Sequence, residues 1–138
     1  MNEMTINGLP LPAALSAAIT EQRWIVPADA AALERVFTER PEEPNFYTFE
    51  YMQFENSKWP ALAARSPRLC GTPDESTPPG DIDPELSVLI GDLGYDMPFA
   101  LDYRTSMTEP RVLYASPESG RWVTVATRIE ELLAELGL

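Results

Sequence analysis

The sequence predicts an α+β fold in which helices come first, an antiparallel sheet follows, and one helix closes the chain. Apolar residues recur at helical spacing up to about residue 58 and again after residue 128, whereas between residues 87 and 126 they alternate with a period of two. Helices and strands segregated along the chain in this way are typical of the α+β class. The 138 residues, 44% of them hydrophobic, suit one domain spanning residues 1–138.

Three helices are predicted in the first half. The first runs from Leu11 to about Gln22, and the second opens at Asp29, whose carboxylate suits an N-cap. The third covers residues 48–58, and Trp59 followed by Pro60 is expected to end it. The segment 46–59 is rich in aromatic residues. Core packing explains most of them, while a partly exposed aromatic contact patch stays open as an alternative.

Residues 67–84 form a different kind of segment, with five prolines and two glycines. That density excludes a helix or a central strand, so we expect a long, ordered surface loop. Asp83 followed by Pro84 can cap a single helical turn.

Four short strands then form an antiparallel meander, because their connections are short and contain Pro, Gly, Ser and Glu. They cover residues 87–90, 98–104, 111–116 and 121–126. In the second strand Phe99, Leu101 and Tyr103 face one side, and Ala100 and Asp102 face the other.

The closing helix begins after a capping-box pattern in which Thr127 precedes Glu130 by three residues. Gly137 ends this helix. Its apolar face consists of Ile129, Leu132, Leu133 and Leu136.

Composition restricts the partners. The net charge is −12, which repels nucleic-acid phosphates and anionic lipid and attracts a basic protein. We therefore expect a protein partner, without direct nucleic-acid or membrane binding, although a merely solvated acidic surface is the plain alternative. Residues 1–15 show no signal-peptide pattern, no stretch approaches a membrane span, and Cys70 is the only cysteine. These features favour a reducing, cytoplasmic location.

The residue inventory also restricts the chemistry. The chain has no histidine, which removes histidine-based acid–base catalysis and most zinc sites. Lys58 is the only lysine, and the sequence contains no glycine-rich phosphate loop. We therefore predict no catalytic residues, no cofactor and no metal site, and the protein is expected not to be an enzyme.

Acidic residues are unevenly placed, because eight of them and no base lie between Arg68 and Arg104. Two of Asp92, Asp96 and Asp102 could serve a small hydrolase, and the run could hold a hard cation, but neither pattern is specific. An acidic binding surface on the proline-rich loop and on the hairpin of residues 91–102 is the favoured interpretation. The predicted partner-binding residues are Trp59, Asp74, Glu75, Asp81, Asp83, Asp92, Asp96 and Asp102.

The segment 91–103 contains a motif whose residue types can be explained physically. Gly91 and Gly94 permit a positive φ or a close backbone approach, and Asp92 and Asp96 can accept backbone N–H bonds in the turn. Pro98 can begin a strand without losing a ladder bond. Tyr103 belongs to the same motif.

Residues 90–104 resemble the signature stretch of the SUKH superfamily, in its Smi/Knr-like branch. That signature is a strand, Gly-Asp-x-Gly, a nearby Asp, a Pro, and a second strand ending in Leu-Asp-Tyr-Arg. The resemblance extends over about residues 71–138 and more loosely upstream. It implies a binding role, with no catalytic residues. Bacterial members resemble immunity proteins that neutralise toxins, many of them basic nucleases, and fungal relatives regulate cell-wall synthesis. An immunity protein and a regulator or scaffold with an endogenous protein client therefore both remain open.

Overall fold

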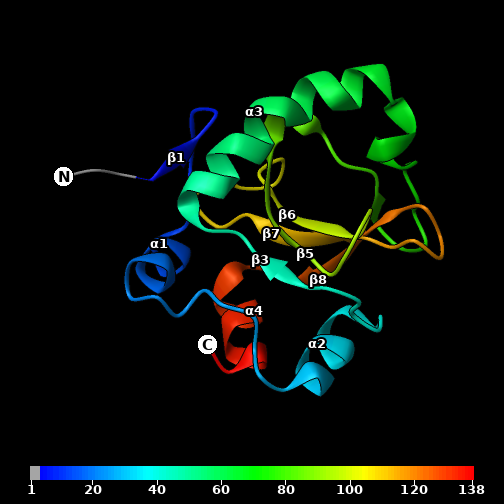
Figure 1. Ribbon diagram of the computed structural model, residues 1–138. Coiled ribbons are helices and arrows are strands. Elements are labelled where there is room, and N and C mark those ends of the chain that lie inside the picture. The colour runs from blue at the N-terminus through cyan, green and yellow to red at the C-terminus, as the bar shows by residue number, and fades with distance from the viewer. Residues whose placement is uncertain (1–3) are drawn as a thin grey trace.

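The computed structural model describes residues 4–138 and has three layers, with an antiparallel sheet between helices (Figure 1). The first three residues of the segment that lacks a signal-peptide pattern lie outside the described residues. The sheet has the strand order β3-β5-β6-β7-β8-β4. Its strands are β3 (Asn45–Phe46), β4 (Pro79–Gly80), β5 (Ser87–Asp92), β6 (Pro98–Asp102), β7 (Arg111–Ala115) and β8 (Trp122–Ala126).

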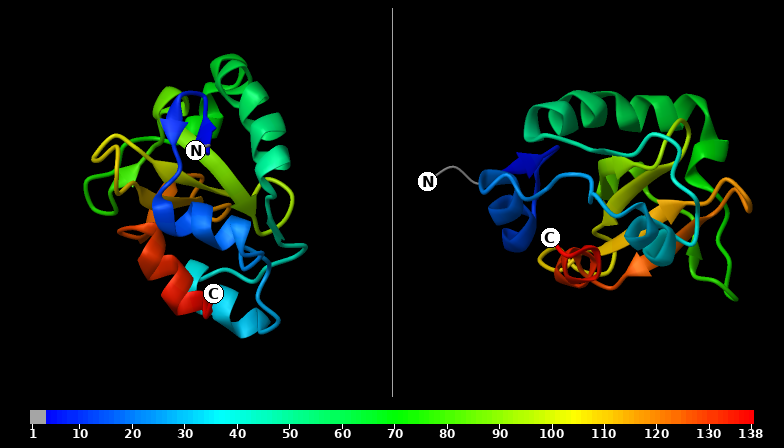
Figure 2. Two further views of the ribbon diagram at one scale, coloured as in Figure 1. Left: turned by 90° about the vertical axis from the view of Figure 1, so that its left-hand side faces the viewer. Right: turned by 60° about the horizontal axis from the view of Figure 1, so that its bottom comes forward.

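Helices cover both faces of this sheet, as two further views show (Figure 2). One long helix lies on one face, and three short helices lie together on the other. The helices are α1 (Ala13–Thr20), α2 (Ala30–Phe37), α3 (Phe49–Arg65) and α4 (Ile129–Leu136), with single turns η1 (Pro67–Cys70) and η2 (Pro84–Leu86). Within residues 4–138, no helix is both long enough and apolar enough to cross a membrane.

The α+β prediction and the meander of β5 to β8 are confirmed, but the sheet has six strands where the sequence predicts four. The two additions, β3 and β4, lie at its edges and are only two residues long. Pro79 is tolerated in β4 because an edge strand can leave a missing N–H toward solvent. The proline-rich loop therefore folds back onto β8 and closes one side of the sheet. A small separate hairpin of β1 (Thr5–Ile6) and β2 (Leu9–Pro10) was not predicted either.

Two predicted caps are confirmed. The Asp29 carboxylate accepts a bond from the Ala31 N–H at 3.0 Å and begins α2. The Asp83 carboxylate accepts one from the Glu85 N–H at 2.9 Å and begins η2.

The predicted end of the third helix is wrong, because α3 continues through Pro60 to Arg65. A proline inside a helix removes the bond to the carbonyl four residues earlier, which here belongs to Asn56. The Asn7 side chain donates to that carbonyl at 3.0 Å and so replaces the missing bond. A residue of the β1–β2 hairpin thus allows the helix to continue.

The capping box before α4 is also corrected. The N-cap is Arg128, which makes no side-chain cap, and Thr127 donates instead to the Glu131 carboxylate at 2.8 Å. The predicted stop at Gly137 is confirmed, with a left-handed φ of 72°.

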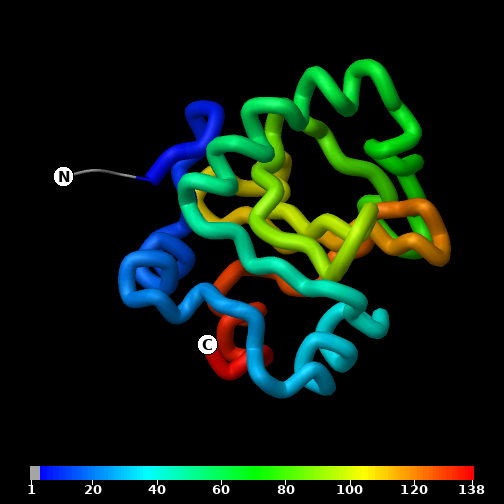
Figure 3. The backbone as a smooth tube through the Cα atoms, in the orientation of Figure 1, coloured from blue at the N-terminus to red at the C-terminus, as the bar shows by residue number. Residues whose placement is uncertain are grey.

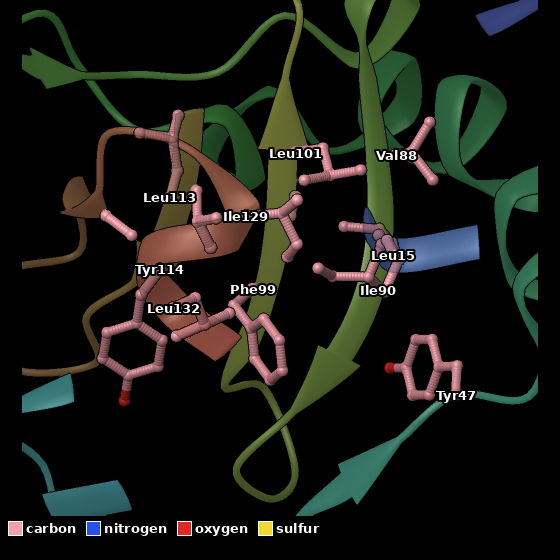
Figure 4. Packing of buried hydrophobic residues seen from close by; sticks show 14 of the residues in the cluster. Leu15, Tyr47, Val88, Ile90, Phe99, Leu101, Leu113, Tyr114, Ile129 and Leu132 are labelled. Atoms are coloured by element: carbon pink, nitrogen blue, oxygen red, sulfur yellow. The ribbon is translucent and has the colours of Figure 1, made fainter. Parts of the chain in front are cut away.

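The core occupies both faces of the sheet, because helices cover each. Phe99, Tyr114, Ile129 and Leu132 point into one apolar cluster beneath the sheet (Figure 4). Ala100, on the opposite face of β6, is equally buried because α3 covers that face.

Candidate functional site

The most buried of the predicted site residues is Asp102, which belongs to a network of two acids and two bases. Its carboxylate lies 3.0 Å from Arg104 Nε and 2.7 Å from Arg111 Nε, and Arg104 also reaches Asp81 Oδ1 at 2.9 Å. Burial alone would raise the pKa of Asp102, but the bonds from Arg104 and Arg111 outweigh it and hold that pKa below its usual value. Asp102 is fully buried, which corrects the expectation that its carboxylate lies on a partner-binding surface.

Trp59 is likewise part of the interior. Its side chain is 4% exposed, its indole N–H donates to Ser87 Oγ at 3.0 Å, and its ring lies 6.2 Å from that of Trp122. This side chain joins α3 to the sheet and is not on the surface where a partner was expected to contact it.

Acids of the proline-rich loop are largely bonded to other groups of this chain. Asp74 accepts bonds from the N–H and the hydroxyl of Ser76 and forms an ion pair with Arg121 at 2.7 Å. These bonds from Ser76, followed by that from Arg121, lower the pKa of Asp74. Asp83 caps η2, while Glu75 is exposed. This loop therefore has mainly a structural role. Few of its acidic side chains remain free to bind a partner.

The β5–β6 turn is held by Asp92. Its carboxylate accepts bonds from the Tyr47 hydroxyl at 2.8 Å, from Asn45 Nδ2 at 3.2 Å and from the Gly94 N–H at 3.1 Å. Burial, followed by the Asp92 carboxylate, raises the pKa of Tyr47 well above its usual value, so the hydroxyl remains a donor. The turn is rigidly attached to β3 and to the segment before α3.

The glycines of the motif have the roles that the sequence indicates. A side chain at Gly91 would bring its Cβ to 2.8 Å from the Asn45 carbonyl oxygen, so β3 can pair only with a glycine here. Gly94 has a φ of 148°, and a Cβ there would lie 3.2 Å from that of Glu42. Pro98 begins β6, and the Tyr103 hydroxyl donates to the Pro10 carbonyl at 2.7 Å.

These contacts build a surface that we call the acidic turn, made of Glu42, Glu43, Asp92, Tyr95 and Asp96. Tyr95 stands at the tip of the turn and is 89% exposed. None of the four carboxylates forms an ion pair within residues 4–138. The sequence pointed to Asp92 and Asp96 but not to Tyr95, Glu42 or Glu43. A tyrosine between two turn aspartates was the one available signal.

The glutamates reach the acidic turn through a backbone contact. The Glu42 N–H donates to the Leu93 carbonyl at 2.9 Å, which places the segment after α2 beside the β5–β6 turn. Nothing local in the sequence links positions so far apart along the chain.

A hydrolytic pair made of Asp92 and Asp102 is poorly supported by this geometry. Asp92 pairs with Pro98 at one end of β6, and Asp102 lies at the other end. Four residues of strand separate these positions by roughly 13 Å, beyond the spacing that glycosidase carboxylates require. In residues 4–138 no three His, Cys, Asp or Glu side chains are arranged to hold a metal ion.

The aromatic residues of segment 46–59 fall into a buried group and an exposed group. Tyr47 and Trp59 are buried and Phe46 packs against the core, whereas Tyr51 and Phe54 are 45% and 58% exposed on α3. Core packing therefore explains Phe46, Tyr47 and Trp59, whereas Tyr51 and Phe54 are exposed and the contact patch stays a hypothesis for them.

No protein-family model matches this chain, and neither a curated protein nor a solved structure shows significant similarity to it. Function is therefore inferred from the acidic turn itself and from the resemblance of residues 90–104.

Proposed function

We propose that this protein is a non-enzymatic binding protein of the SUKH type, an immunity protein that neutralises a cognate bacterial toxin by binding a basic surface of it. The observation that carries this proposal is the acidic turn. A nearly fully exposed tyrosine stands there among four carboxylates that have no ion-pair partner within the described residues.

Each part of the acidic turn suits such binding. Tyrosine is enriched among the residues that dominate binding energy, because it offers a large contact area at a low entropic cost. Unpaired carboxylates accelerate encounter with a basic partner, since opposite potentials attract over a Debye length. The bonds to Asp92 hold the turn in place before binding, which lowers the cost of ordering it.

The test is co-expression with each toxin encoded beside the gene, followed by binding measurements on the purified pair. We expect protection of the cells and a complex whose association rate falls steeply with salt. Tyr95→Ala is expected to weaken that complex by roughly 30-fold, the loss that a hot-spot residue of about 2 kcal/mol gives.

The matched control is Glu75→Gln, paired with Asp96→Asn. Both remove one exposed carboxylate, but only Asp96 belongs to the acidic turn. A complex weakened equally by both variants, or by neither, would refute the acidic turn as the binding surface. If no neighbouring toxin binds and an endogenous protein does so through Tyr95, the regulatory alternative replaces the immunity role.

A further inference from the structure

A second surface, on the far side of the sheet from α4, is exposed and apolar. Tyr51, Phe54 and Leu62 of α3 are 45%, 58% and 43% exposed, and their spacing places them on one side of the helix. The outward position of α3 is visible in the backbone trace (Figure 3). We call these residues, with Lys58 and Arg65 between and after them, the α3 stripe.

The α3 stripe lies beside a groove. A shallow groove of about 370 Å³ runs between α3 and β5, and apolar parts of Leu62, Trp59 and Leu89 line it. Single exposed apolar residues are ordinary, but three along one helix beside a groove form a contiguous apolar patch and therefore a candidate contact surface.

The two ends of the α3 stripe carry opposite charge. At the N-terminal end the Asp92 carboxylate, which forms no ion pair within residues 4–138, accepts a bond from the Tyr47 hydroxyl at 2.8 Å, and the Tyr47 ring lies 4.8 Å from that of Tyr51. Toward the C-terminal end are Arg65 and Arg68, and neither forms an ion pair within residues 4–138. No acid occurs between Glu55 and Asp74.

Lys58 lies midway along the α3 stripe and is already neutralised. Its ammonium is 3.2 Å from the Glu55 carboxylate and 4.3 Å from the centre of the Phe54 ring. A long lysine stem can lie along an apolar surface while its charged end stays in water, so Lys58 does not oppose a contact here.

We propose that the α3 stripe binds a second copy of this chain, with the two α3 helices antiparallel about a twofold axis near Lys58. Residues 51 and 65 are each seven positions from residue 58, and residues 54 and 62 are each four. In this register Tyr51 meets the partner's Arg65, and Phe54 meets the partner's Leu62. The same contacts recur on the other side of the axis, as a twofold interface requires.

Charge complementarity favours this occupant over others. An acidic partner would suit Arg65 and Arg68 but would meet the Asp92 carboxylate, which has no ion-pair partner among residues 4–138, and a basic partner would have the reverse problem. An antiparallel second copy places each basic end against an acidic, aromatic end, where an arginine can also stack on the Tyr51 ring. The antiparallel helix dipoles add to the match.

The interface is small. The exposed parts of three such side chains amount to on the order of 300 Å² per copy, below the roughly 800 Å² per partner of a standard interface. The dimer is therefore weak and concentration-dependent, and its acidic end shares Asp92 with the acidic turn proposed above to bind the toxin.

Sedimentation equilibrium of the full chain from about 10 µM to 1 mM tests this proposal. The average mass is expected to rise from 15.4 kDa toward twice that value. Arg65→Glu is expected to weaken dimerisation at least tenfold, and Arg35→Glu, which makes the same charge change on α2, is expected to leave it unchanged.

A second variant distinguishes a loss of dimerisation from a loss of the folded structure. The double variant Tyr51→Arg with Arg65→Glu places an arginine at position 51 opposite the new carboxylate at position 65 of the partner and is expected to recover part of the dimer, while thermal unfolding of each variant checks the fold. A constant mass of 15.4 kDa at 1 mM would overturn the proposal. So would equal effects of the Arg65 and Arg35 variants, or a toxin complex that Phe54→Ala disrupts while the free protein stays monomeric.

Discussion

Replacing Asn56 by alanine removes the amide that completes the outer edge of β5. Beyond the end of β3 this edge has no strand partner, and α3 lies there instead. Asn56 Oδ1 accepts from the Leu89 N–H at 2.8 Å, and Asn56 Nδ2 donates to the Leu89 carbonyl at 2.9 Å and to the Met52 carbonyl at 2.8 Å. One side chain thus replaces the two bonds that a neighbouring strand would make.

The cost follows from what alanine leaves behind. Asn56 is fully buried and Leu89 is 7% exposed, so the substitution leaves one buried N–H and one buried C=O without partners. Each such group costs about 1–3 kcal/mol, and water entering from the groove beside Leu89 recovers part of this cost. We expect Asn56→Ala to lower the free energy of unfolding by about 3 kcal/mol, a large share of the 5–15 kcal/mol typical of a domain.

Urea denaturation followed by tryptophan fluorescence measures this loss. With a slope of about 2 kcal/mol per molar, the midpoint is expected to fall by roughly 1.5 M. Gln53→Ala is the matched control, because it removes an exposed amide from the same helix, and it is expected to change the free energy by less than about 0.5 kcal/mol. If Asn56→Ala lowered the free energy of unfolding by less than about 1 kcal/mol, with an unchanged slope against urea concentration, the outer edge of β5 would not depend on the Asn56 side-chain amide.

Two further predictions concern the ion network and the motif. The pKa of Asp102 is lowered in the folded protein, so its contribution is fully present above the unfolded value of about 3.9 and is lost as the pH falls through the lower folded value. The difference in urea midpoint between the wild type and Asp102→Asn should therefore shrink from pH 7 to pH 2, and an equal difference at both would contradict the network. Gly91→Ala places a methyl group against the Asn45 carbonyl and should destabilise the protein by about 2 kcal/mol. It should also speed hydrogen exchange at the Tyr47 amide, which bonds the Ile90 carbonyl, and unchanged exchange there would show that β3 tolerates the side chain.

Sequence reasoning was most reliable where a segment is long enough to show its own period. The strands β5 to β8 and the caps of α2 and η2 were predicted because their signals are local. Two-residue strands carry no period, so β3 and β4 could not be found. Pro60 is the clearest failure, since the rule that ends a helix there was offset by Asn7, which lies far away along the chain.

The charges of the candidate site show the same limit, because ion pairs between residues far apart along the chain cannot be read from the sequence. The run between Arg68 and Arg104 has no base in sequence, but in space Arg104 folds back onto Asp81 and Arg121 onto Asp74. Two acids of the proline-rich loop are therefore neutralised.

Pairing of this kind changes where a basic partner is expected to bind. The β5–β6 turn receives no arginine among the described residues, and instead gains Glu42 and Glu43 from the segment that follows α2. The β5–β6 turn and its neighbours thus keep four carboxylates without an ion pair among the described residues, whereas the proline-rich loop keeps two, Glu75 and Asp83. Because attraction between exposed charges decays within about 8–10 Å at physiological salt, an encounter is decided by the nearest unpaired carboxylates. A basic partner should therefore meet Tyr95 first, and the proline-rich loop should contribute mainly by holding the sheet edge in place.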